Sequence, residues 1–381
     1  MREIVIAGGG PAGAAAACLL AGAGRAVTLI ERDAAPAHKI CGEFLSAEAQ
    51  QDLAALGLDL AALGARPISR VRLVRGAAVV QAALPFRGLG LSRRTLDEAL
   101  LRHAAACGAE VMRGHAIRSL STEDAPGRGL TLDVAGIGEL RAATVFLATG
   151  KHDLRGVRRQ VRRPPPARIG FKTYFTLAPA QARALEGQIE IILFAGGYAG
   201  LQMVEGGLAN LCLLAGSARF ERAGRQWQGL LDDLRRGSSH LHARLAGAVP
   251  QLARPLSIWR VPYGFVHVPR PTDPPGLFRL GDQAGVIPSF SGDGISIALH
   301  SARVAARTWL GGGDAGVYHR RLRREIGGQI ARAMVLDRCG ATAGGQAMLM
   351  GACRAWPPLL RAAAELTRIP AAARCAGNAP V

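Results

Sequence analysis

The chain has 381 residues, 49% of them hydrophobic, so its length allows two or three globular domains with buried cores. Its formal net charge is +19, but nearly all of it is arginine, since the lysines are only Lys39, Lys151 and Lys172. No zinc-finger spacing, RNP motif or aromatic-interleaved basic patch accompanies the charge, so we expect no nucleic-acid partner. Apart from residues 4–24, whose glycines argue against a membrane span or signal peptide, no run of about 18 apolar residues occurs.

The seven cysteines show no C-x-x-C spacing, so the sequence signals neither a zinc site nor a redox disulfide, and we expect no metal. They are odd in number and scattered along a long chain, which is typical of a reducing cytoplasm. We therefore expect a cytoplasmic protein, with contact to a membrane surface as the alternative.

The first motif is an apolar run at residues 4–7, the turn Gly8-Gly9-Gly10-Pro11-Ala12-Gly13, a helix of small residues, a second apolar run and Glu31. This order of strand, glycine turn, helix, strand and acid is typical of dinucleotide binding. Gly8 allows the sharp turn, Gly10 lets a pyrophosphate approach, and Gly13 lets the helix pack closely on the sheet. The helix N-terminus favours phosphate. Glu31 would accept hydrogen bonds from ribose hydroxyls and repel a 2′-phosphate, which favours NAD or FAD over NADP.

The segment that follows alternates helices and strands. Apolar spacing and caps predict a helix at 47–56 after Ser46, two strands within 68–84, a helix at 92–106 after Ser92, a strand from 109 to 112, a hairpin at 121–140 and a buried strand at 143–148 that leads to Gly150. The segment Arg155–Arg168 contains prolines and no acid. We expect it to be an exposed connector between domains.

From residue 169 the hydrophobic period drops to two, which predicts an antiparallel sheet. We expect its strands at 169–177, 189–194, 198–204 and 208–214, a further strand-like stretch at 256–268, and helices at 220–236 and 239–248. The α/β pattern returns with a strand at 277–280 that runs into Gly281-Asp282, and a glycine turn then opens a helix at 295–310. Two or three helices should follow at 315–369, with a loose tail after Pro370.

This arrangement resembles the FAD-dependent oxidoreductases of the p-hydroxybenzoate hydroxylase type. The resemblance rests on the Gly8–Arg32 motif, on the helix that Arg93 and Arg94 begin, and on residues 280–302, LGDQAGVIPSFSGDGISIALHSA. It covers residues 1–310. It implies an α/β fold: a Rossmann-type FAD-binding domain with an inserted antiparallel β-sheet substrate domain and C-terminal helices.

The resemblance also implies which residues bind FAD. Asp282 would hold the ribityl chain, and the turn before the helix at 295–310 would offer backbone N–H groups to the flavin ring, where the helix dipole stabilises negative charge. The expected FAD-binding residues are Gly8, Gly10, Pro11, Ala12, Gly13, Glu31, Arg32, Cys41, Gly42, Arg93, Gly150, Gly281, Asp282, Pro288, Gly292, Asp293, Gly294 and Ile295. The expected domains are FAD-binding segments at 1–67, 86–160 and 271–312, substrate-domain segments at 68–85 and 161–270, and a helical region at 313–381.

Two stretches, Lys39-Ile40-Cys41-Gly42 and Gly197-Tyr198-Ala199-Gly200, resemble patterns of the geranylgeranyl reductase-like and flavin monooxygenase branch. Three departures limit what this implies. The sequence Gly150-Lys151-His152-Asp153 lacks the Asp-Gly pair of the hydroxylases, which weakens any parallel with their NADPH handling. Gly200 stands where the branch has tryptophan, and the halogenase motif W-x-W-x-I-P is absent, so we do not expect halogenation.

The leading expectation is an FAD-dependent monooxygenase of secondary metabolism that hydroxylates a hydrophobic small molecule with O₂. NAD(P)H, if used, would bind only transiently as reductant. One alternative is reduction of isoprenoid C=C bonds, and another is a flavin-binding protein that docks an acidic carrier protein or anionic membrane through Arg155–Arg168. The sequence does not identify catalytic residues, because Cys41 either shapes the flavin pocket or fills a loop. The sequence does not separate pocket residues from core or surface residues among Lys151, His152, Tyr198, Tyr263 and His267.

Overall fold

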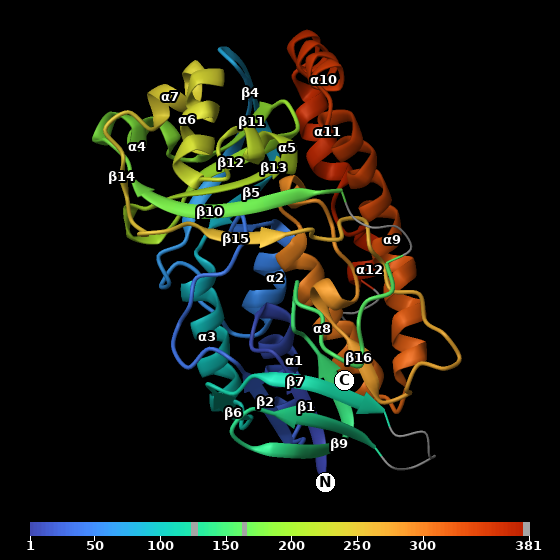
Figure 1. The fold of residues 1–381 in the computed structure, drawn as a ribbon. Coiled ribbons are helices and arrows are strands. Elements are labelled where there is room, and N and C mark those ends of the chain that lie inside the picture. The colour runs from blue at the N-terminus through green and yellow to red at the C-terminus, as the bar shows by residue number, and fades with distance from the viewer. Residues whose placement is uncertain (123–128, 162–165, 376–381) are drawn as a thin grey trace.

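The computed structural model describes residues 1–122, 129–161 and 166–375. Two β-sheets lie one above the other in Figure 1, and long C-terminal helices run along the side of both. This confirms the expected α/β class and the division into two sheets. Within the described residues, no helix is both long enough and apolar enough to cross a membrane.

The first sheet has the strand order β6-β2-β1-β9-β8-β7, with β16 also paired to β9. Its strands are β1 (Arg2–Ala7), β2 (Val27–Glu31), β6 (Glu110–Arg113), β7 (Ile117–Thr122), β8 (Leu130–Val134), β9 (Gly138–Leu147) and β16 (Leu277–Arg279). Strands β1, β2, β6, β9 and β16 are parallel, as in a Rossmann-type fold. Strand β9 contains both the end of the hairpin expected at 121–140 and the buried strand expected at 143–148. The hairpin's residues 123–128 lie outside the described ranges.

Helix α1 (Pro11–Gly22) packs against β2, α3 (Arg93–Ala106) and α8 (Gly294–Leu310). Its alanines at positions 14–17 are at most 1% exposed, and this run of small side chains lets the helix approach its neighbours closely. Ser92 caps α3, and Ser46 caps α2 (Ala47–Ala55), each by accepting a hydrogen bond from a backbone N–H in the first turn. Both caps confirm the sequence prediction.

The second sheet has the order β14-β10-β13-β12-β11-β4-β5-β3, with β15 paired to β10. Its strands are β3 (Phe44–Leu45), β4 (Arg66–Arg75), β5 (Ala78–Gly90), β10 (Arg168–Thr176), β11 (Gln188–Phe194), β12 (Gly197–Met203), β13 (Ala209–Gly216), β14 (Val249–Pro250) and β15 (Leu256–Trp259). The strands β10 to β13 pair antiparallel, as predicted, and β11 also pairs in parallel with β4, which the sequence did not predict. The strand expected at 256–268 ends at Trp259, since Arg260 and Gly264 adopt φ of 54° and 85° and Pro262 lies between them.

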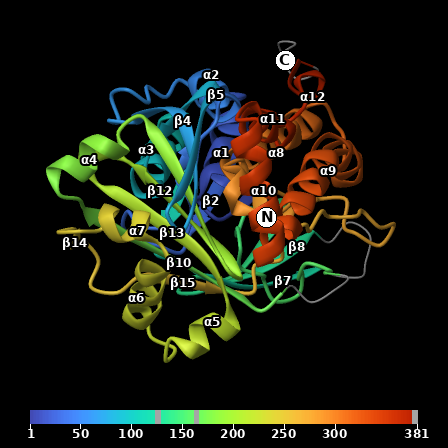
Figure 2. The ribbon, with the colours of Figure 1, turned by 90° about the horizontal axis from the view of Figure 1, so that it is seen from above.

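Four helices cover the outer face of this sheet: α4 (Pro179–Leu185), α5 (Ser217–Arg222), α6 (Trp227–Gly237) and α7 (Ser239–Arg244). The single helix expected at 220–236 is split, because Gly224 and Arg225 both adopt positive φ. On the side of the molecule seen at right in Figure 2, α9 (Ala315–Gly340), α10 (Ala343–Ala355) and α11 (Pro358–Leu366) contact α8, β4 and β5. The tail after Pro370 begins with a helix, α12 (Ala371–Cys375), and the rest of the tail that was expected to be loose, residues 376–381, lies outside the described residues.

Candidate active site

A cavity of about 610 Å³ lies between the first sheet's glycine turns and the inner face of the second sheet. Two loops complete its wall: residues 38–44 after β2, and residues 148–154 after β9. Every expected FAD-binding residue lines it except Gly13, Pro288 and Asp293. The structure therefore brings motifs that are about 270 residues apart in sequence to one cavity.

The turn before α1 is built from backbone alone. A Cβ on Gly8, whose φ is 111°, would lie 2.5 Å from the Ala148 carbonyl oxygen, and a Cβ on Gly13 would lie 1.9 Å from the Gly8 carbonyl oxygen. Gly10 caps α1 without a side chain, which leaves the free N–H groups of the first turn accessible. Such a helix N-terminus suits an anionic pyrophosphate. Gly13 acts by packing and does not face the cavity.

Charged side chains surround this turn. The Glu31 carboxylate accepts hydrogen bonds from the N–H groups of Gly9 (2.7 Å) and Asp33 (3.0 Å) at the end of β2. Arg93 lines the cavity and pairs with Asp97 through distances of 2.6 and 2.8 Å, whereas its neighbour Arg94 is exposed. Arg93 is therefore the arginine of that helix that can contact a cofactor.

Asp282, at the turn after β16, has a lysine partner. Lys151 Nζ lies 3.5 Å from Asp282 Oδ2 and donates to the Ile40 carbonyl at 3.2 Å. Burial lowers the pKa of Lys151, but Asp282 together with Cys41 and Tyr263 outweighs burial, so the pKa is raised. Lys151 thus lines the cavity as a cation. His152 also lines it, and burial together with Arg32 lowers the pKa of that imidazole.

The connector Arg155–Arg168 is not wholly exposed, contrary to expectation. Arg159 is 8% exposed, pairs with Asp153 at 2.7 Å and donates to the Lys151 carbonyl at 2.6 Å, so it holds the loop that carries Lys151. Arg168 pairs with Asp337 at 2.8 Å. Arg155 and Arg158 are exposed, while Arg162 and Arg163 lie outside the described residues.

The turn before α8 is held by the C-terminal helices. Gly292 adopts a φ of 68°, and a Cβ there would lie 2.7 Å from the Phe44 ring. The next residue, Asp293, is fully buried and points away from the cavity, to Arg368 at 3.0 Å and Gln329 at 3.2 Å. Burial raises the pKa of Asp293 to about 7, and Arg368 offsets part of that rise. Arg368 lies in the C-terminal region, where we predicted no site residue from the sequence.

Comparison with known proteins identifies the cavity. Residues 1–143 match the family described as "FAD binding domain". The chain is 25% identical over 339 residues to the menaquinone reductase of Mycolicibacterium smegmatis, covering 82% of this chain and 77% of that protein. Residues 1–143 are therefore an FAD-binding domain, and the chain is an FAD-binding oxidoreductase.

Solved structures show the same fold. The flavin-dependent brominase Bmp2 superposes with a TM-score of 0.74 at 18% identity over 98% of both chains. The myxobacterial chondrochloren halogenase CndH gives 0.72 at 19% identity, covering 96% of this chain and 91% of that one. A variant of halogenase PltM in complex with FAD gives 0.70 at 16% identity over 88% of this chain and 75% of that one. The backbone cradle at Gly8 and Gly10, the free helix N-terminus and the cavity volume fit FAD in this chain.

The loop after β2 forms one wall of the FAD cavity and is clamped to the second sheet. Glu43, fully buried with a φ of 62°, accepts hydrogen bonds from Lys172, Tyr174 (2.7 Å) and the Arg93 N–H (2.7 Å). Burial raises the pKa of Glu43, and the Lys172 ammonium offsets only part of the rise. Sequence reasoning missed this cluster, because its members come from three separate elements and only the fold brings them together.

Two amides on the second sheet extend the clamp. Asn210 donates to the carbonyls of Cys41 (3.3 Å) and Gly42 (2.9 Å), and Gln202 donates to the Glu43 carbonyl at 2.8 Å. Cys41 lines the FAD cavity. The loop that carries it is therefore held in one position by strands β10, β12 and β13.

Two of the three aromatic or imidazole candidates on the second sheet and its following loop face the cavity. Tyr198 and Tyr263 line it, and the Tyr263 hydroxyl bonds the Ser289 hydroxyl at 2.6 Å. His267 does not line it. Its Nε2 lies 3.2 Å from Asp273 and its ring packs edge-on against His319, and burial lowers the pKa of His267 to about 4. His267 is a packing residue.

Proposed function

We propose that this FAD-dependent oxidoreductase hydroxylates an amphiphilic small molecule with O₂. In this proposal an oxygen atom of the substrate's head contacts Tyr198, and the substrate's apolar chain fills a second cavity. The observation that carries the proposal is the position of Tyr198, which lines both the FAD cavity and the second cavity.

The second cavity has a volume of about 470 Å³ and is enclosed by β4, β11, α9, α10 and α11. The surface of its wall is mainly apolar, with Leu73, Ile191 and Leu336 among its lining residues. The charged residues Arg168, Arg332, Asp337 and Arg368 also line it. Removing a hydrocarbon from water contributes about 0.8 kcal/mol per buried CH₂ group, so this space suits a hydrocarbon chain. Its wall is shared with the FAD cavity at Phe290 and Tyr198.

The Tyr198 hydroxyl supports an oxygen-bearing head. It is buried, and the nearby Ser289 hydroxyl is bonded to Tyr263 at 2.6 Å and is not in hydrogen-bond geometry with Tyr198. Burial raises the pKa of Tyr198 well above its usual value, so the side chain stays a neutral donor at physiological pH. An unpaired buried donor costs about 1–3 kcal/mol, which a substrate oxygen at this point would recover.

Bound FAD would supply the redox chemistry, since reduced flavin reacts with O₂ and can transfer one oxygen atom to an electron-rich ring. The chain's own residues would position the ring and exclude water. Gly200 leaves space on the wall that faces the flavin site, since a Cβ there would meet only the Cys212 carbonyl oxygen, at 3.7 Å. A ring can occupy this space, where the related branch carries a tryptophan.

A second candidate is reduction of an isoprenoid C=C bond. It is favoured by the similarity to a menaquinone reductase and by the Lys39–Gly42 stretch, whose Cys41 lines the FAD cavity. The same apolar cavity would then hold the isoprenoid chain. For either reaction we propose a nicotinamide donor that binds transiently. A contact with an acidic partner would rest on the exposed Arg155 and Arg158.

Oxygen dependence separates the two reactions. The flavin-loaded enzyme is reduced without air and mixed with long-chain phenols or polyprenyl quinones, with and without an O₂ pulse. We expect O₂ uptake and a product heavier by one oxygen atom with the phenols. Anaerobic saturation of the polyprenyl chain would overturn hydroxylation in favour of reduction.

The tyrosine variant tests the position of the substrate's head. Tyr198→Phe should raise KM by about tenfold, because one hydrogen bond of about 1.4 kcal/mol is lost. Tyr263→Phe is the matched control, since that hydroxyl already has Ser289 as a partner, and its KM should change less. An unchanged KM in Tyr198→Phe with every phenol that is turned over would contradict the assigned position of the head.

A further inference from the structure

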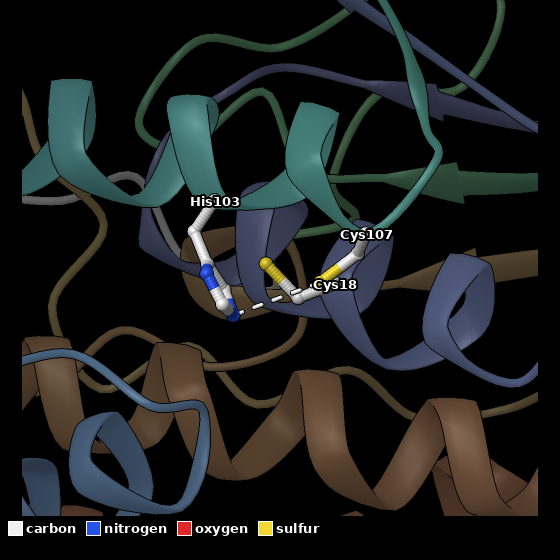
Figure 3. A group of neighbouring side chains, drawn as sticks. All are labelled: Cys18, His103 and Cys107. Atoms are coloured by element: carbon white, nitrogen blue, oxygen red, sulfur yellow. Dashed lines mark hydrogen bonds between the residues drawn. The ribbon is translucent and has the colours of Figure 1, made fainter.

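A group of thiol and imidazole side chains lies between α1 and α3, outside both cavities. Cys18 comes from α1, His103 from the last turn of α3, and Cys107 is the residue that follows α3 (Figure 3). One ligand atom from each residue lies within 4.8 Å of the other two, and His103 Nε2 lies 3.6 Å from Cys107 Sγ. Residues four apart share a helix face, so α3 presents both side chains to α1.

We propose that Cys18, His103 and Cys107 bind one Zn²⁺ ion, which fastens α1 to α3. Zinc binds thiolate sulfur at about 2.3 Å and imidazole nitrogen at about 2.0–2.1 Å, so ligand atoms of one tetrahedral ion lie roughly 3.5–3.8 Å apart. The observed group needs only a small contraction to reach those separations. This site was not predictable from the sequence, because Cys18 lies far from the other two ligands in the chain and no C-x-x-C pair is present.

Charge balance also fits a zinc ion. Binding would release both thiol protons, and two thiolates would neutralise the ion's two positive charges in a buried place. Cys18 is 4% exposed, whereas His103 and Cys107 are half-buried, so an ion can enter from their side.

Three protein ligands leave one coordination position, which water occupies in open zinc sites. The loop after α2 lies beside the imidazole, since a Cβ on Gly57 would be 3.7 Å from His103 Cε1. The site would brace two parts of the FAD cavity, because α1 begins at the glycine turn and α3 begins at Arg93.

Metal analysis of the flavin-loaded full chain tests the site. The protein is stripped with a chelator, titrated with Zn²⁺ against a chromophoric competitor, and separately loaded with Co²⁺. We expect one ion per chain, and Co²⁺ absorption in the red, beyond the flavin bands, with the intensity of a tetrahedral site that has thiolate ligands.

Single substitutions locate the ion. Cys107→Ser and His103→Gln should each weaken Zn²⁺ binding at least tenfold and remove the Co²⁺ band. Cys339→Ser, a half-buried cysteine in α9 outside the group, is the matched control and should bind as the parent does. Both ligand variants should keep their flavin spectrum, which shows that they are folded.

Three outcomes would overturn the proposal. One is the absence of stoichiometric binding to a chain whose thiols are all reduced. Another is binding that survives in both ligand variants. The last is a disulfide between Cys18 and Cys107 in protein that is purified without reductant and contains no metal. That result would make the two cysteines a redox pair instead of metal ligands.

Discussion

Two glutamates are buried against the second sheet, and their surroundings shift their pKa values in opposite directions. Glu190 on β11 is fully buried and meets Arg72 (2.8 Å), Arg244 (2.8 Å) and His240 (2.9 Å). Burial alone would raise the pKa of Glu190, but hydrogen bonds from His240 and Arg244 outweigh burial and lower it to about 2. For Glu43 at the FAD cavity, burial prevails and the pKa is raised.

The difference lies in how completely each carboxylate is satisfied. Both oxygens of Glu190 have cationic partners, which tie β4, β11 and α7 together. In Glu43, all hydrogen bonds go to Oε1, and Oε2 has no partner among the described residues. Glu190 is thus a structural clamp, whereas Glu43 keeps acceptor capacity and an easily gained proton next to a reaction cavity.

The largest expected effect is that of Glu190→Gln. A pKa lowered from 4.5 to about 2 corresponds to about 3 kcal/mol of stability. Removing the charge also leaves Arg244, 5% exposed, without its counter-ion. We expect urea unfolding to show a loss of about 3 kcal/mol at neutral pH, with FAD affinity unchanged. A Glu190→Gln variant that lost FAD but kept the parent's free energy of unfolding would contradict the structural role assigned to Glu190.

The parent and the Glu190→Gln variant also test how the free energy of unfolding depends on pH. Because the pKa of Glu190 is lower in the folded state, the folded protein holds fewer protons than the unfolded one. Its stabilising effect is therefore present above pH 4.5 and is lost as the pH falls toward 2. The stability difference between the parent and Glu190→Gln should shrink over this interval. A difference that stays constant would contradict the assigned pKa.

Glu43→Gln should cost less, about 1 kcal/mol, because the amide oxygen can still accept from Lys172, Tyr174 and the Arg93 N–H. The sign of the pH effect is opposite here. A raised folded-state pKa gives stability that is full at low pH and falls as the pH rises through that value. The parent should show this fall and Glu43→Gln should not, as followed by thermal unfolding with FAD bound.

The smallest effect is expected at the exposed pair of Arg66 and Glu186, whose side chains are 42% and 55% exposed. Exposed ion pairs contribute about 0–1 kcal/mol because water and salt screen them. Glu186→Gln should therefore change the free energy of unfolding by less than about 1 kcal/mol. A loss as large as that of Glu190→Gln would show that burial does not explain the contrast between the glutamates.

The sequence predicted those parts of the site that depend on local backbone. The turn at Gly8–Gly13, the caps at Ser46 and Ser92 and the four strands expected between residues 169 and 214 are local patterns, and the structure contains all of them. The parallel pairing of β11 with β4 was not predictable, because it joins strands that are more than 100 residues apart.

The contacts made by side chains from distant elements were missed for the same reason. Lys172 and Tyr174 read as alternating strand residues, and nothing local links them to Glu43. Asp293 was expected to face the cofactor because it stands in a glycine turn. Its partner Arg368 is 75 residues further along the chain and draws the carboxylate away.

The contact of Arg368 with the turn before α8 has a consequence for biosynthesis. A ribosome releases the chain from its N-terminus, so the glycine turn before α1 emerges long before Arg368. Until then Asp293 lacks its cation, and the turn that would face the flavin ring is unsupported. A chain made only as far as α8 has the nucleotide-binding turn before α1 but lacks the cation that holds the turn before α8. Support for the flavin ring therefore depends on a residue that is synthesised long after the glycine turn.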